Sequence, residues 1–311
     1  MFENLATNNT ASALLSELKN ALCSEKAFLR YNRPFIFVCG GNDKKNGETT
    51  IFSVRSKFLA YAATELPDYE IVLAEAAAES ADGLNQIRYN NIALFEEILA
   101  DISDCVIIFP ESPGSFAEVG YFAKSEEIRK KTLIVNCGDE QKDSFLNKGP
   151  IDLIDRESDF RTKVHIDFKA QVIEFDRVRT RLHERINGSN KSSKKILQKN
   201  FKEMDHRHRL HLIYKIIDIF GAISIEDLKE VILHLFGQFE FRELRDYVGI
   251  LKGIKYVDIY EADGSLVVKN NNAVHPLVEL RNIDENVLLL KVKSYYKRIR
   301  PQLFQVKEFV L

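Results

Sequence analysis

The sequence has 311 residues, which is long enough for two folded domains because single hydrophobic cores usually stop growing near this size. Its formal net charge of −2 provides no whole-protein attraction to nucleic acid, so any such affinity must come from local basic clusters. The four cysteines lack the spacing of metal ligands, and buried free thiols are expected. The sequence has neither a signal-peptide pattern nor an apolar run of membrane-spanning length, which predicts a cytoplasmic protein that does not enter a membrane.

The first half of the chain alternates helical patterns with short apolar runs. A leading helix is expected within residues 11–30, where its simplest role is to cover an edge of a sheet. The apolar runs are continuous, as in strands that are buried on both faces of a parallel sheet. This alternation predicts an α/β fold with a doubly wound parallel sheet. The strands are expected at 35–39, 69–73, 105–109 and 132–137, and the helices at 49–66, 91–102 and 116–131.

A glycine turn follows the first strand. Gly40 and Gly41, with Asn42, would let the backbone come close to a ligand, although a plain turn between strand and helix explains them equally well. The turn is not the G-x-G-x-x-G of a Rossmann dehydrogenase, and the Gly-Lys-Ser/Thr of a P-loop is absent. Neither of these two nucleotide-binding classes is therefore supported.

The apolar run Cys105–Phe109 ends in a Pro/Gly loop that leads into a helix. Ser115 is expected to cap this helix, whose apolar residues lie on one side from Phe116 onwards. A helix N-terminus would then face the carboxyl end of a strand, where open α/β sheets bind ligands and backbone N–H groups attract phosphate. The candidate substrate contacts in this segment are Glu111, Ser112, Gly114 and Ser115.

Glu118 places a carboxylate in the first turn of the expected helix, beside a site for an anionic ligand. One explanation is structural, because Ser115-x-x-Glu118 fits the capping box, in which the glutamate accepts a hydrogen bond from the N–H of the cap residue. The other is catalytic, because carboxylates act as nucleophiles or stabilise oxocarbenium-like centres in glycosyl transfer. Spacing alone favours the cap.

Three segments carry a family resemblance. They are Phe35–Gly41, Asp104–Gly120 with its Pro-Glu-Ser-Pro-Gly-Ser-Phe-x-Glu-x-Gly core, and Ser144–Pro150. Together they resemble the nucleoside deoxyribosyltransferase-like effectors of bacterial retron anti-phage systems. The resemblance implies that Glu118 is the nucleophile that attacks the anomeric carbon of a sugar. Transferases of the wider superfamily carry an aspartate six residues earlier, where this sequence has Ser112, so glycosidic cleavage is better supported than base exchange.

By the same resemblance, the substrate is NAD⁺, and no separate cofactor is expected. Nicotinamide leaves as a neutral base, so its departure needs no protonating acid. Two asparagines complete the candidate substrate contacts. Asn91, with Arg88–Asn90 beside it, lies near the place of a second acid in the superfamily. Asn147 lies in a loop long enough to act as a lid and could donate to a ligand, although a turn-forming asparagine is slightly favoured.

The chain becomes basic from Arg177. Residues 177–215 contain twelve Lys and Arg against three Asp and Glu, around a linker-like run at 187–193. Such a segment fits either an ordinary inter-domain connection or a contact with a phosphate backbone. The histidines at 206, 208 and 211 lack companions at ligand spacing, so no metal site is expected. The candidate nucleic-acid contacts are Lys191, Lys194 and Lys195.

Residues 209–270 have the order of a winged helix-turn-helix: a helix to Phe220, helices at 225–236 and 241–252, and a hairpin around Glu261–Ser265. The third helix would read a major groove, but its charges are of mixed sign, whereas a DNA-facing helix is expected to be basic. A winged helix that contacts protein, or touches a structured nucleic acid through its wing and linker, fits equally well. The basic run at 291–300 would add a phosphate contact or a dimer helix.

These observations predict a catalytic domain at 1–175, a basic helical linker at 176–205 and a winged-helix-like domain at 206–311. The resemblance implies a toxic retron effector, an N-glycosidase that cleaves the nicotinamide–ribose bond of NAD⁺ or a related nucleotide. Its implied partner is a retron reverse transcriptase with its RNA-linked multicopy single-stranded DNA, and a homo-oligomer is compatible with this role. The alternatives are a nucleoside deoxyribosyltransferase and a non-catalytic, nucleotide-sensing DNA-binding regulator. A fragment that ends at Phe175 is expected to keep the nucleotide site.

Overall fold

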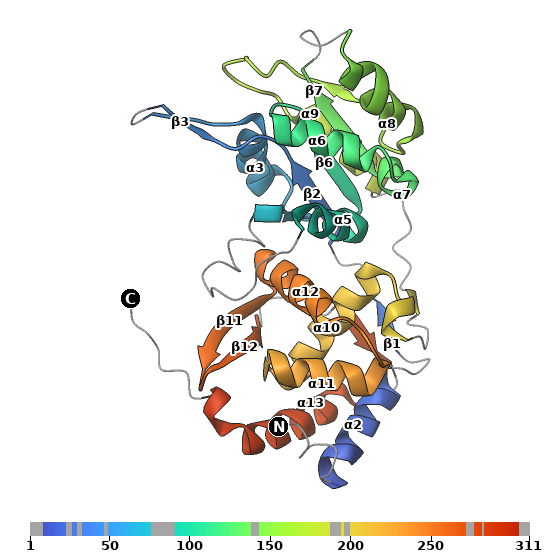
Figure 1. Ribbon diagram of the computed structural model, residues 1–311, viewed down its shortest axis with the longest axis vertical. Coiled ribbons are helices and arrows are strands. Elements are labelled where there is room, and N and C mark those ends of the chain that lie inside the picture. Colours follow the sequence, from blue (N-terminus) through green and yellow to red (C-terminus); the bar gives the residue numbers. More distant parts are fainter. Residues whose placement is uncertain are drawn as a thin grey trace. The chain divides into compact units, whose positions relative to one another are not determined.

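The computed structural model describes residues 9–22, 27–29, 33–46, 49–75, 91–137, 143–186, 194–195, 200–271, 277–281 and 283–304. These residues form two compact units (Figure 1). The sheet unit comprises the described residues of 33–74 and 91–186, and the helical unit comprises those of 9–29, residue 75 and those of 194–304. Within the described part of the chain, no helix is both long and apolar enough to cross a membrane.

The sheet unit is built on a five-stranded parallel sheet with the order β5-β2-β6-β7-β8. Every residue of the three central strands is buried, which explains why their sequences are continuous apolar runs. The α/β class predicted from those runs is therefore confirmed. The strands are β2 (Phe35–Cys39), β5 (Glu70–Val72), β6 (Cys105–Ile108), β7 (Thr132–Asn136) and β8 (Val164–His165).

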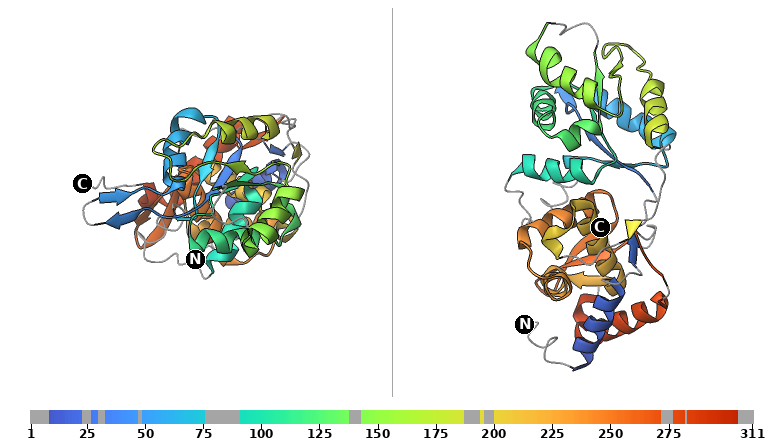
Figure 2. Two further views of the ribbon diagram at one scale, coloured as in Figure 1. Left: turned by 90° about the horizontal axis from the view of Figure 1, so that it is seen from above. Right: turned by 90° about the vertical axis from the view of Figure 1, so that its right-hand side faces the viewer.

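Helices cover both faces of this sheet (Figure 2, right). On one face, α3 (Val54–Glu65) and α9 (Asp176–Ile186) contribute to a core with the sheet residues Ile36, Cys105 and Ile107. On the other face, Phe122 of α6 (Pro113–Phe122) makes an edge contact with Phe37 of β2 at 6.2 Å between ring centroids. The arrangement of helix, sheet and helix is compatible with the doubly wound fold that the sequence predicts. The remaining helical segments are α5 (Ile92–Ile102), α7 (Glu126–Lys130), η1 (Asn147–Ile151) and α8 (Asp152–Glu157).

The chain leaves the neighbouring strands β2 and β6 in opposite directions. After β2 it passes to β5 at one edge, and after β6 it passes to β7 and then to β8 at the other edge. The two strands pair in register from Ile36 opposite Cys105 to Cys39 opposite Ile108, so their carboxyl ends lie side by side. In open α/β sheets, ligands bind at such a switch point.

The segment after the glycine turn differs from the expected helix at 49–66. Residues 49–51 form β4 (Thr49–Ile51), which pairs with β3 (Lys44–Asn46). The helix begins only at Val54, because Ser53 takes the cap position and its Oγ accepts a hydrogen bond from Ser56 N at 3.0 Å. The β-branched residues before Ser53 suit a strand better than a helix.

The leading helix belongs to the helical unit, so the expectation that it covers an edge of the parallel sheet is wrong. α2 (Asn9–Leu22) packs on α11 (Ile225–Phe236) and α13 (Glu285–Ile299), and Glu17 forms an ion pair with Lys291 at 2.9 Å. The next segment, β1 (Ala27–Leu29), lies between β13 (Val278–Leu280) and β9 (Lys194–Lys195) in an antiparallel sheet. The start of the chain is thus part of a fold that is otherwise formed by its end.

The predicted linker at 176–205 is not a structural boundary at its start. Residues 176–186 form α9, which is anchored to the sheet unit: Tyr61 Oη donates to Asp176 at 2.8 Å, and Arg179 pairs with Glu65 at 2.7 Å. Phe175 packs on Phe58 with ring centroids 5.3 Å apart. The change in composition at Arg177 therefore marks a basic outer face of a packed helix, rather than the end of the domain.

The helical unit has the element order that the sequence predicts after residue 206. Helix α10, strand β10, helices α11 and α12 and the β11–β12 hairpin follow one another, and β12 is the central strand of a sheet in the order β10-β12-β11. The hairpin turns at Asp263 and Gly264, which both have positive φ, as expected of a two-residue hairpin turn. The element bounds are α10 (His206–Phe220), β10 (Ala222–Ser224), α11 (Ile225–Phe236), α12 (Phe241–Gly253), β11 (Val257–Ala262), β12 (Ser265–Asn270), α13 (Glu285–Ile299) and the 3₁₀ segments η2 (Phe201–Glu203) and η3 (Pro301–Phe304).

Candidate active site

Glu111 joins the two loops that leave the central strands. Its Oε1 accepts hydrogen bonds from the backbone N–H of Gly41 and of Arg55, each at 3.0 Å, and its Oε2 accepts one from Val54 at 2.7 Å. The third N–H of the first turn of α3, that of Ser56, donates to Ser53. All three first-turn donors of α3 are therefore used inside the protein, so this helix start is closed to a phosphate.

The two glycines of the turn pack against the side chains of Glu111 and Arg55. A Cβ atom on Gly40 would lie 2.7 Å from Cβ of Arg55, and one on Gly41 would lie 3.0 Å from Cγ of Glu111. Packing inside the protein thus gives both positions a reason to be glycine, beside the ligand contact that the sequence suggests.

Arg55 is a charged residue of this site that sequence analysis missed. It is only 8% exposed, and its Nη2 donates to Oδ1 of Asn42 at 2.7 Å. The sequence gives no signal that this arginine is buried, because only the fold brings it against the end of β2. Asn42, a predicted contact, lies with this guanidinium group at the switch point.

Helix α6 begins earlier than its sequence suggests, so the assignment of Ser115 as its cap is wrong. Pro113 occupies the first helical position, for which its ring is well suited, and Ser112 is the N-cap. Ser112 Oγ accepts from Ser115 N at 3.2 Å, while Ser115 Oγ accepts from the N–H of Ser112 at 2.9 Å and of Glu111 at 3.0 Å. The two serines thus complete a capping box between themselves.

This shift places Glu118 in the second turn of α6 and removes capping as the explanation for it. The capping box is closed by Ser115, so the expected partnership of Ser115 and Glu118 in a cap is wrong. Glu118 lies three residues after buried Ser115 and four before buried Phe122, on the side of α6 that faces the protein. The residue is half-buried, and its Oε2 atom is buried.

The other predicted contacts also belong to elements at the carboxyl ends of the strands. Asn147, at the start of η1, accepts a hydrogen bond through Oδ1 from Nδ2 of Asn136 at 3.0 Å, at the end of β7. Asn91 caps α5, with Oδ1 accepting from Ala93 N at 3.0 Å. Gly114 is an exposed residue in the first turn of α6. Arg88–Asn90 lie outside the described residues.

Each of the three histidines at the start of α10 contacts another protein group. Nδ1 of His206 lies 2.6 Å from Tyr247 Oη, and that of His211 lies 2.6 Å from the carbonyl oxygen of Arg207. Nδ1 of His208 lies 2.5 Å from Asp205 Oδ2. Among the described residues, no three His, Cys, Asp or Glu side chains form a group that could hold a metal ion.

The predicted nucleic-acid contacts lie mostly beyond what the structure describes. Lys194 and Lys195 form β9, where they pair with Leu29 and Phe28 of β1. Lys191 lies outside the described residues.

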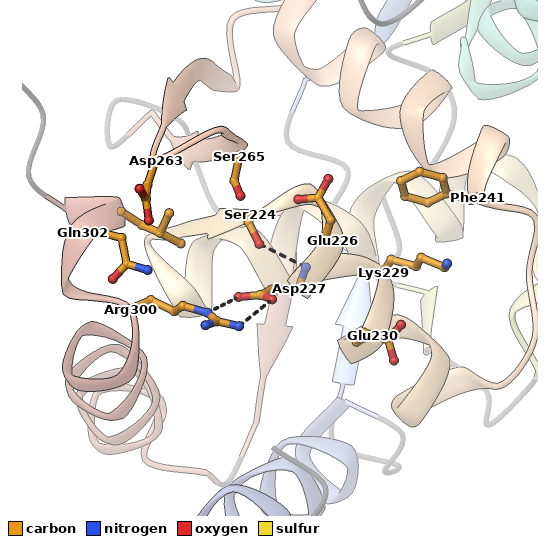
Figure 3. A pocket seen from close by; sticks show the side chains of 11 residues that line it. Ser224, Glu226, Asp227, Lys229, Glu230, Phe241, Asp263, Ser265, Arg300 and Gln302 are labelled. Atoms are coloured by element: carbon orange, nitrogen blue, oxygen red, sulfur yellow. Dashed lines mark hydrogen bonds and ion pairs between the residues drawn. The ribbon is translucent and has the colours of Figure 1, made fainter. Parts of the chain in front are cut away.

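A cavity of about 710 Å³ lies in the helical unit, between the start of α11, the start of α12 and the β11–β12 turn (Figure 3). Asp227 is buried there and accepts hydrogen bonds from Tyr296 Oη at 2.6 Å and Arg300 Nε at 3.1 Å. Burial, together with the charge of Asp227, raises the pKa of Tyr296. The acidic residues that line the cavity are Glu226, Asp227, Glu230 and Asp263.

The sheet unit is an α/β domain of the class that binds ligands at the carboxyl ends of parallel strands. The chain as a whole belongs to the family of the STM3845 retron effector protein, whose model matches residues 52–259, across both units. Two Escherichia coli proteins are similar to it. "Retron Ec73 putative ribosyltransferase/DNA-binding protein" is 26% identical over 240 residues, which cover 72% of this chain and 74% of that protein. "Retron Ec86 putative ribosyltransferase/DNA-binding protein" is 36% identical over 120 residues, 38% of this chain and 36% of that protein.

Proposed function

We propose that the sheet unit cleaves the N-glycosidic bond of NAD⁺ or a related nucleotide, and that Glu118 is the catalytic carboxylate. The observation that carries this proposal is the capping box of α6, which Ser112 and Ser115 complete without Glu118. A carboxylate that no cap requires, on the inner side of a helix at the strand ends, is well placed for chemistry on a sugar. The ribosyltransferase names of both E. coli relatives support glycosyl transfer as the reaction type.

In the proposed reaction, the carboxylate of Glu118 attacks C1′ of the nicotinamide-bearing ribose, or stabilises the positive charge that develops there. The C1′–N bond breaks, and its electron pair neutralises the pyridinium ring, so nicotinamide leaves without a proton. Water then adds its oxygen to C1′ and releases Glu118, and its proton passes to solvent. The products are nicotinamide and ADP-ribose. Ser112, at the place of the superfamily aspartate, is compatible with a leaving group that needs no acid.

The diphosphate of the substrate is assigned to the switch point. The first-turn donors of α3 are used by Glu111 and Ser53, and Pro113 has no N–H. The N–H of Ser115 donates to Ser112 Oγ within the capping box. Among the described first-turn N–H groups of α6, that of Gly114 is therefore the one outside the capping box. Gly114, with the guanidinium group of Arg55 and its partner Asn42, is therefore the proposed phosphate contact.

The helical unit is proposed to hold the enzyme to a retron reverse transcriptase and its single-stranded DNA. The order of α10, β10, α11, α12 and the β11–β12 hairpin is that of a winged helix-turn-helix, and both E. coli relatives carry DNA-binding in their names. The cavity between α11, α12 and the hairpin turn is lined by four carboxylates and two cations, so its net negative charge disfavours a phosphate backbone on that face. The charges around this cavity fit best with a protein partner at the cavity and with nucleic acid on another surface of the helical unit.

The test uses full-length protein, alone and with reverse transcriptase and its DNA, incubated with NAD⁺ or with deoxynucleosides. Equal amounts of nicotinamide and ADP-ribose, separated by chromatography, are the expected products. Transfer of the sugar to an added free base would instead establish a deoxyribosyltransferase. Nucleotide binding without bond cleavage in every mixture would leave a non-catalytic sensor and refute the proposed chemistry.

A further inference from the structure

A second cavity of the helical unit, of about 370 Å³, gathers three lysines from two elements. Lys269 comes from β12, and Lys293 and Lys297 lie four residues apart on α13, hence on one face of that helix. Within the part of the chain that the structure describes, no carboxylate forms an ion pair with any of the three. We call this cavity the lysine pocket.

The lysine pocket is partly preorganised. Gly221, at the end of α10, has a φ of +78°, and a Cβ atom there would lie 3.1 Å from Cε of Lys293. The stem of Lys293 therefore lies along the glycine backbone, which restricts where its ammonium group can go. Asp218, an acidic residue nearby, is already engaged by Lys215 and by Nδ2 of Asn270 at 2.9 Å. The positive charge of the pocket is thus not cancelled by that neighbour.

Aromatic rings line the same cavity. Phe220, Tyr260 and Phe304 are among its lining residues. Tyr260 is held in place because its Oη donates to the carbonyl oxygen of Leu303 at 2.8 Å. Ammonium groups beside aromatic rings are the combination with which proteins bind single-stranded nucleic acid, since phosphates pair with the cations and bases stack on the rings. The volume suits one nucleotide-sized group.

The geometry points to a phosphate of a single-stranded nucleic acid as the ligand of the lysine pocket, with a flanking base against the aromatic rings. This inference rests on the nucleic-acid partner proposed above and assigns the surface that contacts it. The charge distribution within the unit supports it. The other cavity is lined by four carboxylates against two cations, Lys229 and Arg300, and Arg300 is paired with Asp227 (Figure 3). Its net negative charge disfavours a strand. The lysine pocket would then hold the strand, and the acidic cavity would be left for a protein.

The test measures the binding of a fluorescently labelled DNA strand of about a dozen nucleotides to the full-length protein over a range of salt concentrations. Lys269→Gln with Lys297→Gln removes two exposed charges from the pocket. The matched control, Lys202→Gln with Lys255→Gln, removes two exposed charges from the same unit outside the pocket. The pocket variant should bind about tenfold more weakly and lose about 0.7 from the slope of log K against log salt for each contact removed, while the control should match the wild type.

Equal effects of the two double variants, or no effect of either, would overturn the pocket while leaving the nucleic-acid partner in place. A wild-type protein that binds no strand would overturn the partner as well. A free mononucleotide, or polyglutamate, that binds as tightly as the strand and with the same lysine dependence would overturn the assignment to a strand. NAD⁺ cleavage by the wild type and by each variant is measured in parallel. A wild-type protein that binds the strand but does not cleave NAD⁺ would refute the proposed reaction without affecting the assignment of the lysine pocket.

Discussion

Ser112 and Ser115 exchange hydrogen bonds at the start of α6, each accepting from the backbone N–H of the other, at 2.9 and 3.2 Å. This reciprocity sets the first helical residue at Pro113 and leaves Glu118 in the second turn. The consequence is a separation of roles within one short segment: the two serines hold the helix start, Glu111 ties the loops together, and Glu118, which lies outside the capping box, is the proposed catalytic carboxylate. Each role can be tested by a single substitution.

Glu118→Gln should abolish nicotinamide release, because an amide is neither a nucleophile nor an anion that stabilises an oxocarbenium-like centre. The free energy of unfolding should change by less than about 1 kcal/mol, since no cap depends on this residue. Nicotinamide release is followed by chromatography and unfolding by urea titration. Glu127→Gln, on the exposed side of α7, is the control and should keep full activity. Full activity in Glu118→Gln would refute the catalytic assignment.

Glu111→Ala should destabilise the protein by about 2 kcal/mol or more, because three backbone N–H groups lose a charged acceptor at once. Urea unfolding followed by circular dichroism gives this value. Activity is expected to fall as well, since the turn at Gly41 is no longer held against α3. A variant with the free energy of unfolding of the wild type would contradict this prediction, because it would show that water can accept the three hydrogen bonds equally well.

Ser112→Ala and Ser112→Asp separate the cap from the chemistry. The alanine should cost about 1 kcal/mol of stability, whereas aspartate, itself a good N-cap, should cost little. Because aspartate also restores the residue that superfamily transferases carry here, Ser112→Asp should gain base exchange relative to the wild type. The assay adds a free base to the reaction and looks for the exchanged nucleoside. Equal losses of stability in both variants would contradict the capping role.

A fragment that ends at Phe175 should fold poorly, contrary to the expectation from composition. It lacks α9, whose Val178 and Leu182 are buried in the core of the sheet unit. A fragment of residues 33–186 keeps this helix and should unfold cooperatively. Thermal unfolding of the two fragments provides the comparison. A cooperative transition for the shorter fragment, at the same temperature as for the longer one, would show that α9 is dispensable.

Charge reversal at Lys191, Lys194 and Lys195 tests the basic segment separately from the lysine pocket. If the segment contacts phosphates, strand binding should weaken by about an order of magnitude and become less sensitive to salt. Fluorescence anisotropy at low and moderate salt provides both quantities. If these reversals leave strand binding unchanged, the segment does not contact nucleic acid and only connects the two units.

The elements that the sequence predicts well are those with a purely local cause. The strands at 35–39, 105–108 and 132–136 are continuous apolar runs, and the hairpin follows from Asp263-Gly264 between two β-favouring segments. The sequence misses what depends on distant partners. The apolar stripe of α2 shows that the helix is buried but not that α11 and α13 bury it.

The candidate site shows the same division. Glu118 and Asn147 are candidates from sequence because their segments carry a family pattern, and Asn42 is one because it follows the glycine turn. Arg55 was missed because its burial arises only when α3 meets the end of β2. The start of α6 was misplaced by one helical turn, since Ser112 and Ser115 are both acceptable caps and only the position of Pro113 in the folded helix decides between them.

The pairing of β1 with β13, from Ala27 opposite Leu280, also constrains the order of events during synthesis. The sheet unit is encoded within residues 33–186, so all of its strands leave the ribosome while β13 is still to be translated. Domains generally fold as units as they emerge. The nascent chain is therefore expected to carry a folded sheet unit well before the helical unit can close around its own N-terminal strand. Translation itself would then set an interval in which the folded sheet unit, the proposed site of catalysis, exists without the completed helical unit.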